Sequence, residues 1–175
     1  MLSYPSYKRG FTLIELMIAV AILAILLSAV LPNFRAWIQN AKIRTATESL
    51  KNGLQLARVE AIRQNQGVFF RLDGTDSTWT VATVETAAAS SVQIQRRSSA
   101  EGSSNVTLDP TGGTTATFNG LGRAVGLTRI IVEVPVSILP TNEQRKLRIL
   151  VTSGGQIRSC DPRFTDLADP RVCPL

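Results

Sequence analysis

The sequence contains no histidine among its 175 residues. Histidine is the usual general base and the commonest metal ligand, so its absence removes Ser–His and Cys–His nucleophile pairs and most metal sites. Only two cysteines are present and they do not form a C-x-x-C motif, which argues against a zinc knuckle or a thioredoxin-type redox site. We therefore predict a protein that is not an enzyme and that has no cofactor and no metal site.

The two cysteines, Cys160 and Cys173, lie near the C-terminus. A pair that closes a short terminal loop is typical of a structural disulfide, which forms in an oxidising compartment. Two unpaired thiols in the cytosol are the alternative.

The formal net charge is +6, of which Lys8 and Arg9 contribute two. An excess of this size permits binding to anionic partners such as nucleic acid, but it does not require it.

Charge is also scarce in one long run, because Glu15 is the only charged residue between positions 11 and 31. As a helix, this run covers about 30 Å, the thickness of a bilayer core. It is longer than the ~7–15 apolar residues of a secretory signal peptide, and it ends in "LPNF" without a small-residue cleavage site. We predict a membrane span that stays with the protein. Charges flank it on both sides, so its orientation rests on the cysteine pair, which favours a C-terminal domain outside the cytoplasm.

Glu15 needs an explanation within such a span. An unpaired carboxylate near one end of a membrane helix costs about 2–3 kcal/mol, and no Lys or Arg lies elsewhere in residues 11–31. A partner would have to come from another subunit, or from a new amino terminus made beside Glu15 by cleavage. The alternative is that the carboxylate reaches to the lipid headgroups.

The string "KRG" followed by "FTLIEL" (residues 8–16) resembles the cleavage motif of type IV prepilins and of type II secretion pseudopilins. The resemblance implies that prepilin peptidase cuts after Gly10 and that the new amino terminus, Phe11, is methylated. It implies that Glu15 neutralises the amino terminus of a neighbouring subunit during assembly, because a buried carboxylate is tolerated when it is paired. It also implies that Pro32 bends the helix.

Later strings are similar to the GspH/FimT/FimU-like branch of that superfamily: "LQLARVEAIRQN" (54–65), "TFNGLGR" (117–123) and "LRILVTSGGQIRSCDPR" (147–163). The branch implies a minor type IV pilin that joins the pilus or primes its assembly, expected at the tip. The implied partners are other minor pilins, the major pilin, the inner-membrane assembly platform and membrane lipid. The implied location is the bacterial inner membrane, with a single span and a periplasmic C-terminal domain, and then the filament. A type II secretion pseudopilin is an alternative with the same N-terminal features.

A second alternative is a DNA-binding minor pilin that acts as a receptor in natural transformation. Some pilins of this branch bind DNA through a C-terminal G-R-x-R motif, whereas this chain has "GGQIRSCDPR", with glutamine at the first arginine. Phe164 is the only aromatic residue nearby for base stacking. The candidate contacts to phosphate are Arg148, Arg158 and Arg163.

Beyond the span, the pattern predicts an α+β fold in which one helix packs on an antiparallel sheet. Apolar or small residues recur at three- and four-residue steps and predict a helix from about 11 to 64. They are Phe34, Trp37, Ile38, Ala41, Leu50, Leu54, Ala57, Ala61 and Ile62. Gly53 weakens this pattern by up to ~1 kcal/mol, and Arg58, Glu60 and Arg63 are expected on exposed faces.

From Gly67 the period changes to that of strands. Strands are predicted at 68–73, 76–84, 92–97, 106–109, 115–119, 129–134, 147–152 and 156–160, with Asp73 and Gly74 at the first hairpin turn. The glycine-rich strings at 120–126 and 153–156 are interpreted as turns, because neither opens an apolar-periodic helix as a phosphate loop does. The predicted organisation is a leader at 1–10, a transmembrane and filament-core helix at 11–32, its amphipathic half at 33–65 and a β-rich domain at 66–175 with the cysteine loop.

Overall fold

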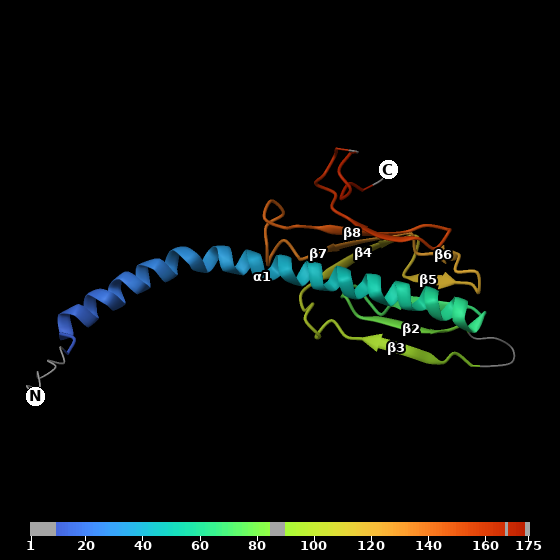
Figure 1. Ribbon diagram of the computed structural model, residues 1–175, viewed down its shortest axis with the longest axis horizontal. Coiled ribbons are helices and arrows are strands. Elements are labelled where there is room, and N and C mark those ends of the chain that lie inside the picture. Colours follow the sequence, from blue (N-terminus) through green and yellow to red (C-terminus); the bar gives the residue numbers. More distant parts are fainter. Residues whose placement is uncertain (1–9, 85–89, 167, 174–175) are drawn as a thin grey trace, which may run out of the picture. The chain divides into compact units, whose positions relative to one another are not determined.

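The computed structural model describes residues 10–84, 90–166 and 168–173, with side chains left out at 28–33. It separates into two units, Met1–Arg35 and Ala36–Leu175. The first is the N-terminal part of α1, and the second is a domain in which the rest of α1 packs on two antiparallel sheets (Figure 1). The predicted fold class is confirmed.

Helix α1 runs from Leu13 to Gln64, close to the predicted 11–64. It ends where Asn65 takes a left-handed backbone conformation, with φ of 49°. The amide of Asn65 then donates to the carbonyl of Ile62, and the amide of Gln66 donates to the carbonyl of Ala61. This is the Schellman arrangement, and Asn is the residue other than Gly that most readily adopts it.

The buried face of α1 begins further along the chain than predicted. Its buried residues follow helical spacing and are Ile43, Ala46, Thr47, Ser49, Leu50, Gly53, Leu54, Ala57 and Ala61. Phe34 and Trp37, predicted in the stripe, are 52% and 65% exposed. Ala41 and Ile62 are exposed as well. The periodicity marks a face of the helix, but it does not say at which residue the sheets begin to cover that face. Arg58, predicted to be exposed, is half-buried.

Five antiparallel strands form the first sheet, in the order β3-β2-β1-β5-β6. Their bounds are β1 Val68–Leu72, β2 Trp79–Thr83, β3 Gln93–Arg97, β5 Thr115–Phe118 and β6 Ala124–Gly126. Strand β6 was missed, because it lies inside the glycine-rich string interpreted as a turn. The first hairpin connection is also longer than predicted. It runs from Asp73 to Thr78, and the amide of Asp73 donates to the carbonyl of Thr78.

Four antiparallel strands form the second sheet, in the order β4-β7-β8-β9. Their bounds are β4 Thr107–Thr111, β7 Arg129–Glu133, β8 Leu147–Val151 and β9 Ile157–Cys160. The inner residues of both sheets share one core with α1. The sheet residues of this core with no measurable exposure are Val68, Phe70, Val81, Ala116, Phe118, Ile130, Val132 and Ile149.

Gly53 faces this core at a point where the helix lies very close to the first sheet. A Cβ atom at Gly53 would lie 2.9 Å from a ring carbon of Phe70 and 3.0 Å from two ring carbons of Trp79. The Trp79 ring is held in place, because its Nε1–H donates to Ser49 Oγ at 2.9 Å. The sequence pattern marked Gly53 as a weakness in the helix, whereas the structure needs a residue without a side chain there.

We expect Gly53→Ala to destabilise the domain although alanine is the better helix former. The gain in helix propensity is at most about 1 kcal/mol, and forcing a methyl group into a filled site typically costs about 1–3 kcal/mol. Urea unfolding followed by circular dichroism measures the difference. Asn52→Ala is the matched control, because Asn52 is the exposed neighbour in the same helix. A G53A variant more stable than wild type would contradict the close packing.

Candidate functional site

The bond between Gly10 and Phe11 lies in the non-helical stretch just before α1. Gly10 and Phe11 are both exposed, and a Cβ atom placed on Gly10 would meet nothing within 4 Å. Residues 1–9, which carry the rest of the predicted leader, lie outside the described residues. A peptidase needs an accessible segment, and the described side of this bond is exposed and non-helical.

Thr12 and Glu15 start the helix together. The amide of Glu15 donates to Thr12 Oγ1 at 3.3 Å, and the amide of Leu16 donates to the Thr12 carbonyl at 3.2 Å. Thr12 is therefore the N-cap, and T-x-x-E is the pattern of a capping box. The pattern is present in the sequence, but it was not among the predicted features. The carboxylate lies in the first turn, where the helix dipole favours a negative charge.

Around Glu15 the surface of α1 is apolar. From Leu16 to Leu27 every side chain is apolar and exposed, and residues 10–27 contain no Lys or Arg. An apolar surface of this length requires a cover, which can be lipid or other subunits. Within the described part of the chain, no helix combines the length and the apolar character needed to cross a membrane. Pro32, the predicted bend, lies among the side chains outside the description.

The C-terminal loop is closed by the Cys160–Cys173 disulfide, with 5.1 Å between the Cα atoms. Ion pairs hold the loop internally. Arg163 contacts both carboxylate oxygens of Asp161, at 3.0 and 2.6 Å, and Arg171 contacts those of Asp169 at 3.0 and 2.7 Å. The Arg171 guanidinium also lies 3.7 Å from the centre of the Phe164 ring. The loop is thus a compact element of its own.

These ion pairs predict a loss of stability in acid. Hydrogen bonds from Arg163 lower the pKa of Asp161 in spite of its burial, and those from Arg171 lower the pKa of Asp169 to about 2. A carboxyl whose pKa is lower in the folded state stabilises the fold above its unfolded pKa of about 3.9, and the contribution is lost as pH falls through the folded value. We expect the thermal midpoint to fall between about pH 4 and pH 2. Asp161→Asn should weaken that dependence, and an unchanged profile would show that this pair contributes nothing.

Of the three predicted DNA-contacting arginines, the structure brings two together. Arg158 on β9 is the cross-strand partner of Leu150 on β8, and Arg148 lies two residues before Leu150 on the same face. Arg129 on β7, which the sequence analysis did not single out, is the partner of Leu150 on the other side. Arg163 does not join them, because it pairs with Asp161.

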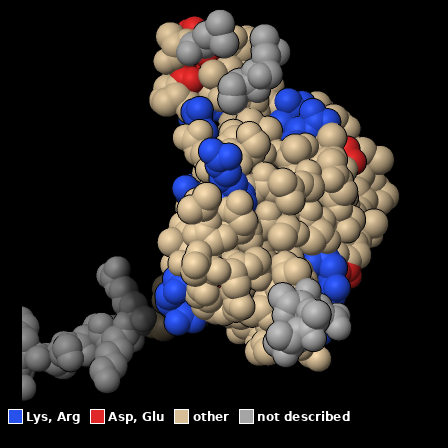
Figure 2. Space-filling view, turned by 90° about the vertical axis from the view of Figure 1, so that its right-hand side faces the viewer, with Lys and Arg blue, Asp and Glu red and all other residues tan. Residues whose placement is uncertain are grey.

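Arg129, Arg148 and Arg158 form no ion pair with a described residue. The Nη2 of Arg129 donates to Thr111 Oγ1 at 3.0 Å. The Nε atoms of Arg129 and Arg148 are buried without an acceptor, so both side chains lie against the sheet. Seen from the end of the domain near β6, basic side chains form separate groups rather than one continuous surface (Figure 2).

An open groove of about 650 Å³ lies beside β6. Its lining is mainly apolar, and Arg123 is the one charged residue among the described residues that line it: Gly67, Val84, Thr117, Phe118, Asn119, Arg123, Ala124, Val125, Ser153 and Gly154. Among the described residues no three of His, Cys, Asp and Glu are grouped as a metal site would need.

Two family models match the chain. A prokaryotic N-terminal methylation motif matches residues 5–31. The model of type II transport protein GspH matches residues 46–155, which is more than half of the sequence. A comparison with curated proteins gave no significant match.

Several solved structures have similar folds. The minor pseudopilin EpsH from the type 2 secretion system of Vibrio cholerae is 20% identical, with a TM-score of 0.50 over 70% of this chain and 98% of that chain. The type IV minor pilin FimU of Pseudomonas aeruginosa is 17% identical, with a TM-score of 0.49 over 66% and 86%. Escherichia coli GspH is 15% identical, with a TM-score of 0.47 over 73% and 94%. At such identities the EpsH likeness supports the fold, a long helix packed on antiparallel strands.

Proposed function

Because the chain belongs to the GspH family of minor pilins and pseudopilins, we propose that it is a minor type IV pilin that helps to prime a pilus and remains at its tip. Members of this family are structural subunits rather than enzymes. The family and the methylation motif imply a membrane-anchored N-terminal helix, a periplasmic domain, processing by prepilin peptidase and contact with other pilins. The tip position, the assembly platform and the priming role belong to the proposal.

The observation that carries the proposal is the state of Glu15. Its carboxylate is exposed in the first turn of α1, beside a long apolar surface, and residues 10–27 offer it no cation. Cleavage after Gly10 would create an ammonium group at Phe11 in every subunit. A neighbouring subunit would then bring this ammonium to Glu15, and the two charges would leave water as a pair, which is tolerated where a lone charge is not.

We assign a role to each segment in the order of the chain. Residues 1–10 are the leader, 11–32 the membrane and filament-core helix, 33–65 the helical spine of the domain, and 66–175 the β-rich domain. The disulfide suits the oxidising periplasm. Pro32 would allow the helix to bend between membrane and domain, because proline removes one backbone hydrogen bond.

Analysis of the amino terminus tests this processing. The chain purified from membranes should begin with N-methylated Phe11, and Gly10→Val should leave the full-length precursor. Purification from a strain without prepilin peptidase is the control. A wild-type chain that keeps Met1 while another prepilin in the same cells is cut would refute the proposal.

A type II secretion pseudopilin remains the first alternative, because the N-terminal features are common to both systems. The similarity to EpsH is as compatible with a secretion pseudopilin as with a minor pilin of a pilus. Gene neighbourhood and the secretion of exoproteins in a deletion strain separate the two roles.

DNA capture is the second candidate, favoured by the three arginines around Leu150 that have no acidic partner among the described residues. Phosphate contacts of this kind weaken as salt is raised. The full chain in detergent should bind duplex DNA at low salt, and the double variant Arg148→Ala/Arg158→Ala should not. Arg163→Ala is the matched control, since that arginine already pairs with Asp161. No binding by wild type at low salt would end this candidate.

A further inference from the structure

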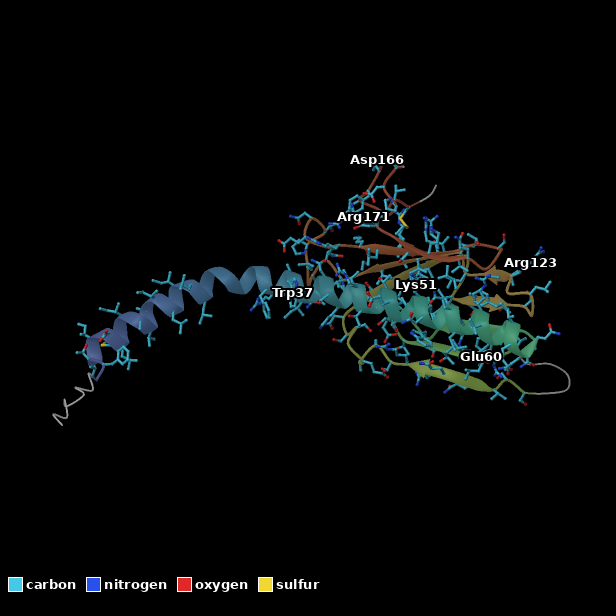
Figure 3. All side chains as sticks on the ribbon, in the orientation of Figure 1. Trp37, Lys51, Glu60, Arg123, Asp166 and Arg171 are labelled. Carbon is cyan, nitrogen blue, oxygen red and sulfur yellow. A yellow bond between two sulfur atoms is a disulfide. The ribbon has the colours of Figure 1, made fainter. Side chains whose placement is uncertain are left out.

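The end of the domain at which α1 enters carries exposed apolar side chains on two separate elements. Trp37 on α1 is 65% exposed (Figure 3). On the connection between β7 and β8, Val136 is 67% and Ile138 42% exposed. Figure 1 shows this connection, in orange, turned toward the same end. Two elements from distant parts of the sequence, each with exposed apolar side chains, therefore lie at this end of the domain.

Hydrogen bonds attach the β7–β8 connection to α1. Asn40 lies one turn after Trp37. Its Nδ2 donates to the Glu143 carbonyl at 3.0 Å, and its Oδ1 accepts from the Arg145 amide at 2.7 Å. The proximity of Trp37 to this connection is thus a property of the folded domain.

Buried residues within the connection hold its shape. Leu139 is part of the core. Gln144 is buried, its Nε2 donates to the Leu139 carbonyl, and its Oε1 accepts from the Val134 amide. The amide of Ile138 donates to the carbonyl of Pro135 at 2.9 Å. The exposure of Val136 and Ile138 is therefore built into the fold.

The charges around this end are mostly basic. Lys42 and Arg44 lie on α1, and Arg145 lies on the β7–β8 connection. Residues 35–47 contain no acidic residue, and residues 134–148 contain one, Glu143. Arg44 and Arg145 are exposed, and Lys42 Nζ donates to Ser104 Oγ at 3.0 Å. Exposed arginines beside apolar side chains match the chemistry of a lipid surface, whose phosphates attract cations and whose interface accepts tryptophan.

Distance along α1 places Trp37 at the right level for such a contact. From Leu13 to Trp37 the length along the helix is about 36 Å at 1.5 Å per residue, and a bilayer is ~40–45 Å thick with its headgroups and about 30 Å without them. If Leu13 enters the apolar core at one edge, the core ends near residue 33. Trp37 then lies about 6 Å beyond it, in the headgroup layer.

We propose that Trp37, Val136 and Ile138 form a membrane-interface surface, which seats the domain on the headgroup layer while Arg145 contacts anionic lipid. The proposal rests on the membrane anchoring in the proposed function. It adds that the domain itself is a lipid-binding element before assembly. When the subunit enters a filament, this surface would have to leave the lipid headgroups. Its affinity for lipid would therefore oppose extraction of the subunit from the membrane.

The two tryptophans of the chain make a direct test possible. Trp37 is exposed, whereas Trp79 is 2% exposed in the core and serves as an internal reference. The full chain is placed in vesicles of phosphatidylcholine and phosphatidylglycerol whose acyl chains carry bromine either near the headgroup or near the terminal methyl. We expect stronger fluorescence quenching by the shallow bromine, and we expect Trp37→Phe to abolish most of it.

Further variants locate the surface. Val136→Ser/Ile138→Ser should weaken shallow quenching of Trp37, whereas Leu121→Ser/Val125→Ser should leave it unchanged, because those two residues are exposed near the other end of α1. Arg145→Gln should reduce the increase in quenching that phosphatidylglycerol gives over phosphatidylcholine alone.

Flotation of the same vesicles tests membrane anchoring separately from the interface surface. A chain that does not float with the vesicles contradicts the membrane anchoring itself. A chain that floats, but whose quenching is the same in wild type and W37F, overturns only the interface surface. Protection of Trp37 from aqueous iodide by an added pilin, without quenching by lipid, would also overturn it and would identify a subunit contact instead.

Discussion

Glu15→Ala should leave prepilin cleavage largely intact and remove most of the subunit from filaments. Without the carboxylate, the ammonium group at Phe11 of the adjacent subunit has no counter-charge when the apolar helices pack together. Breaking a buried ion pair by removing one partner costs about 3–5 kcal/mol, which corresponds to a loss of about 100-fold or more in incorporation. Sheared filament fractions compared with membrane fractions by immunoblot measure the ratio.

Two variants separate ion pairing from helix capping. Glu15→Gln removes the charge but keeps a side chain that can complete the capping box, so it should fail nearly as badly as Glu15→Ala. Thr12→Val removes the hydroxyl that accepts from the Glu15 amide. It should cost only about 1 kcal/mol of helix stability and should allow incorporation. Normal incorporation of the alanine variant would refute the pairing argument.

Gly155→Ala should have the largest effect on the stability of the domain. Gly155 has a φ of +77°, and a Cβ atom there would overlap the carbonyl oxygen of Gly122. That oxygen belongs to the backbone of the turn before β6, so it cannot move away as a flexible side chain would. The left-handed conformation costs about 1–2 kcal/mol for alanine, and the overlap adds about 1–3 kcal/mol. Urea unfolding should show a total loss of about 2–5 kcal/mol.

Two other glycines divide that loss into its parts. Gly154 has no positive φ, and its Cβ would have Thr152 Oγ1 as nearest neighbour at 3.8 Å, so Gly154→Ala should be close to neutral. Gly113 has a φ of +108° and open space around it, so Gly113→Ala reports the backbone cost alone. If all three variants lose the same stability, the close approach of Gly155 to Gly122 has no energetic weight.

Local patterns predicted the helix and most strands of this fold. The helix ends at the predicted residue, Gln64, and eight predicted strands correspond to eight of the observed strands. Strand β6 was missed because Ala124–Gly126 has only three residues and lies within a glycine-rich string, although it forms a hairpin with the preceding strand β5. The division of the strands into two sheets depends on distant pairings such as β4 with β7, which the sequence pattern does not encode.

The same distinction applies to the candidate site. The cleavage motif, Glu15 and the cysteine pair are local features and could be recognised directly, as could the T-x-x-E cap that was overlooked. The grouping of Arg129 with Arg148 and Arg158 depends on strand register, and so could not be read from spacing. Gly53 shows the limit of propensity scales, because its role is set by the Phe70 and Trp79 rings across the interface.

The most direct test of the priming role is a count of surface pili by electron microscopy in a clean deletion strain in which filament retraction is also disabled. The account predicts few or no pili, with recovery when the wild-type gene is restored and no recovery with Glu15→Ala. Normal numbers of pili in the deletion strain would contradict a priming role and would assign the subunit to secretion or to DNA capture.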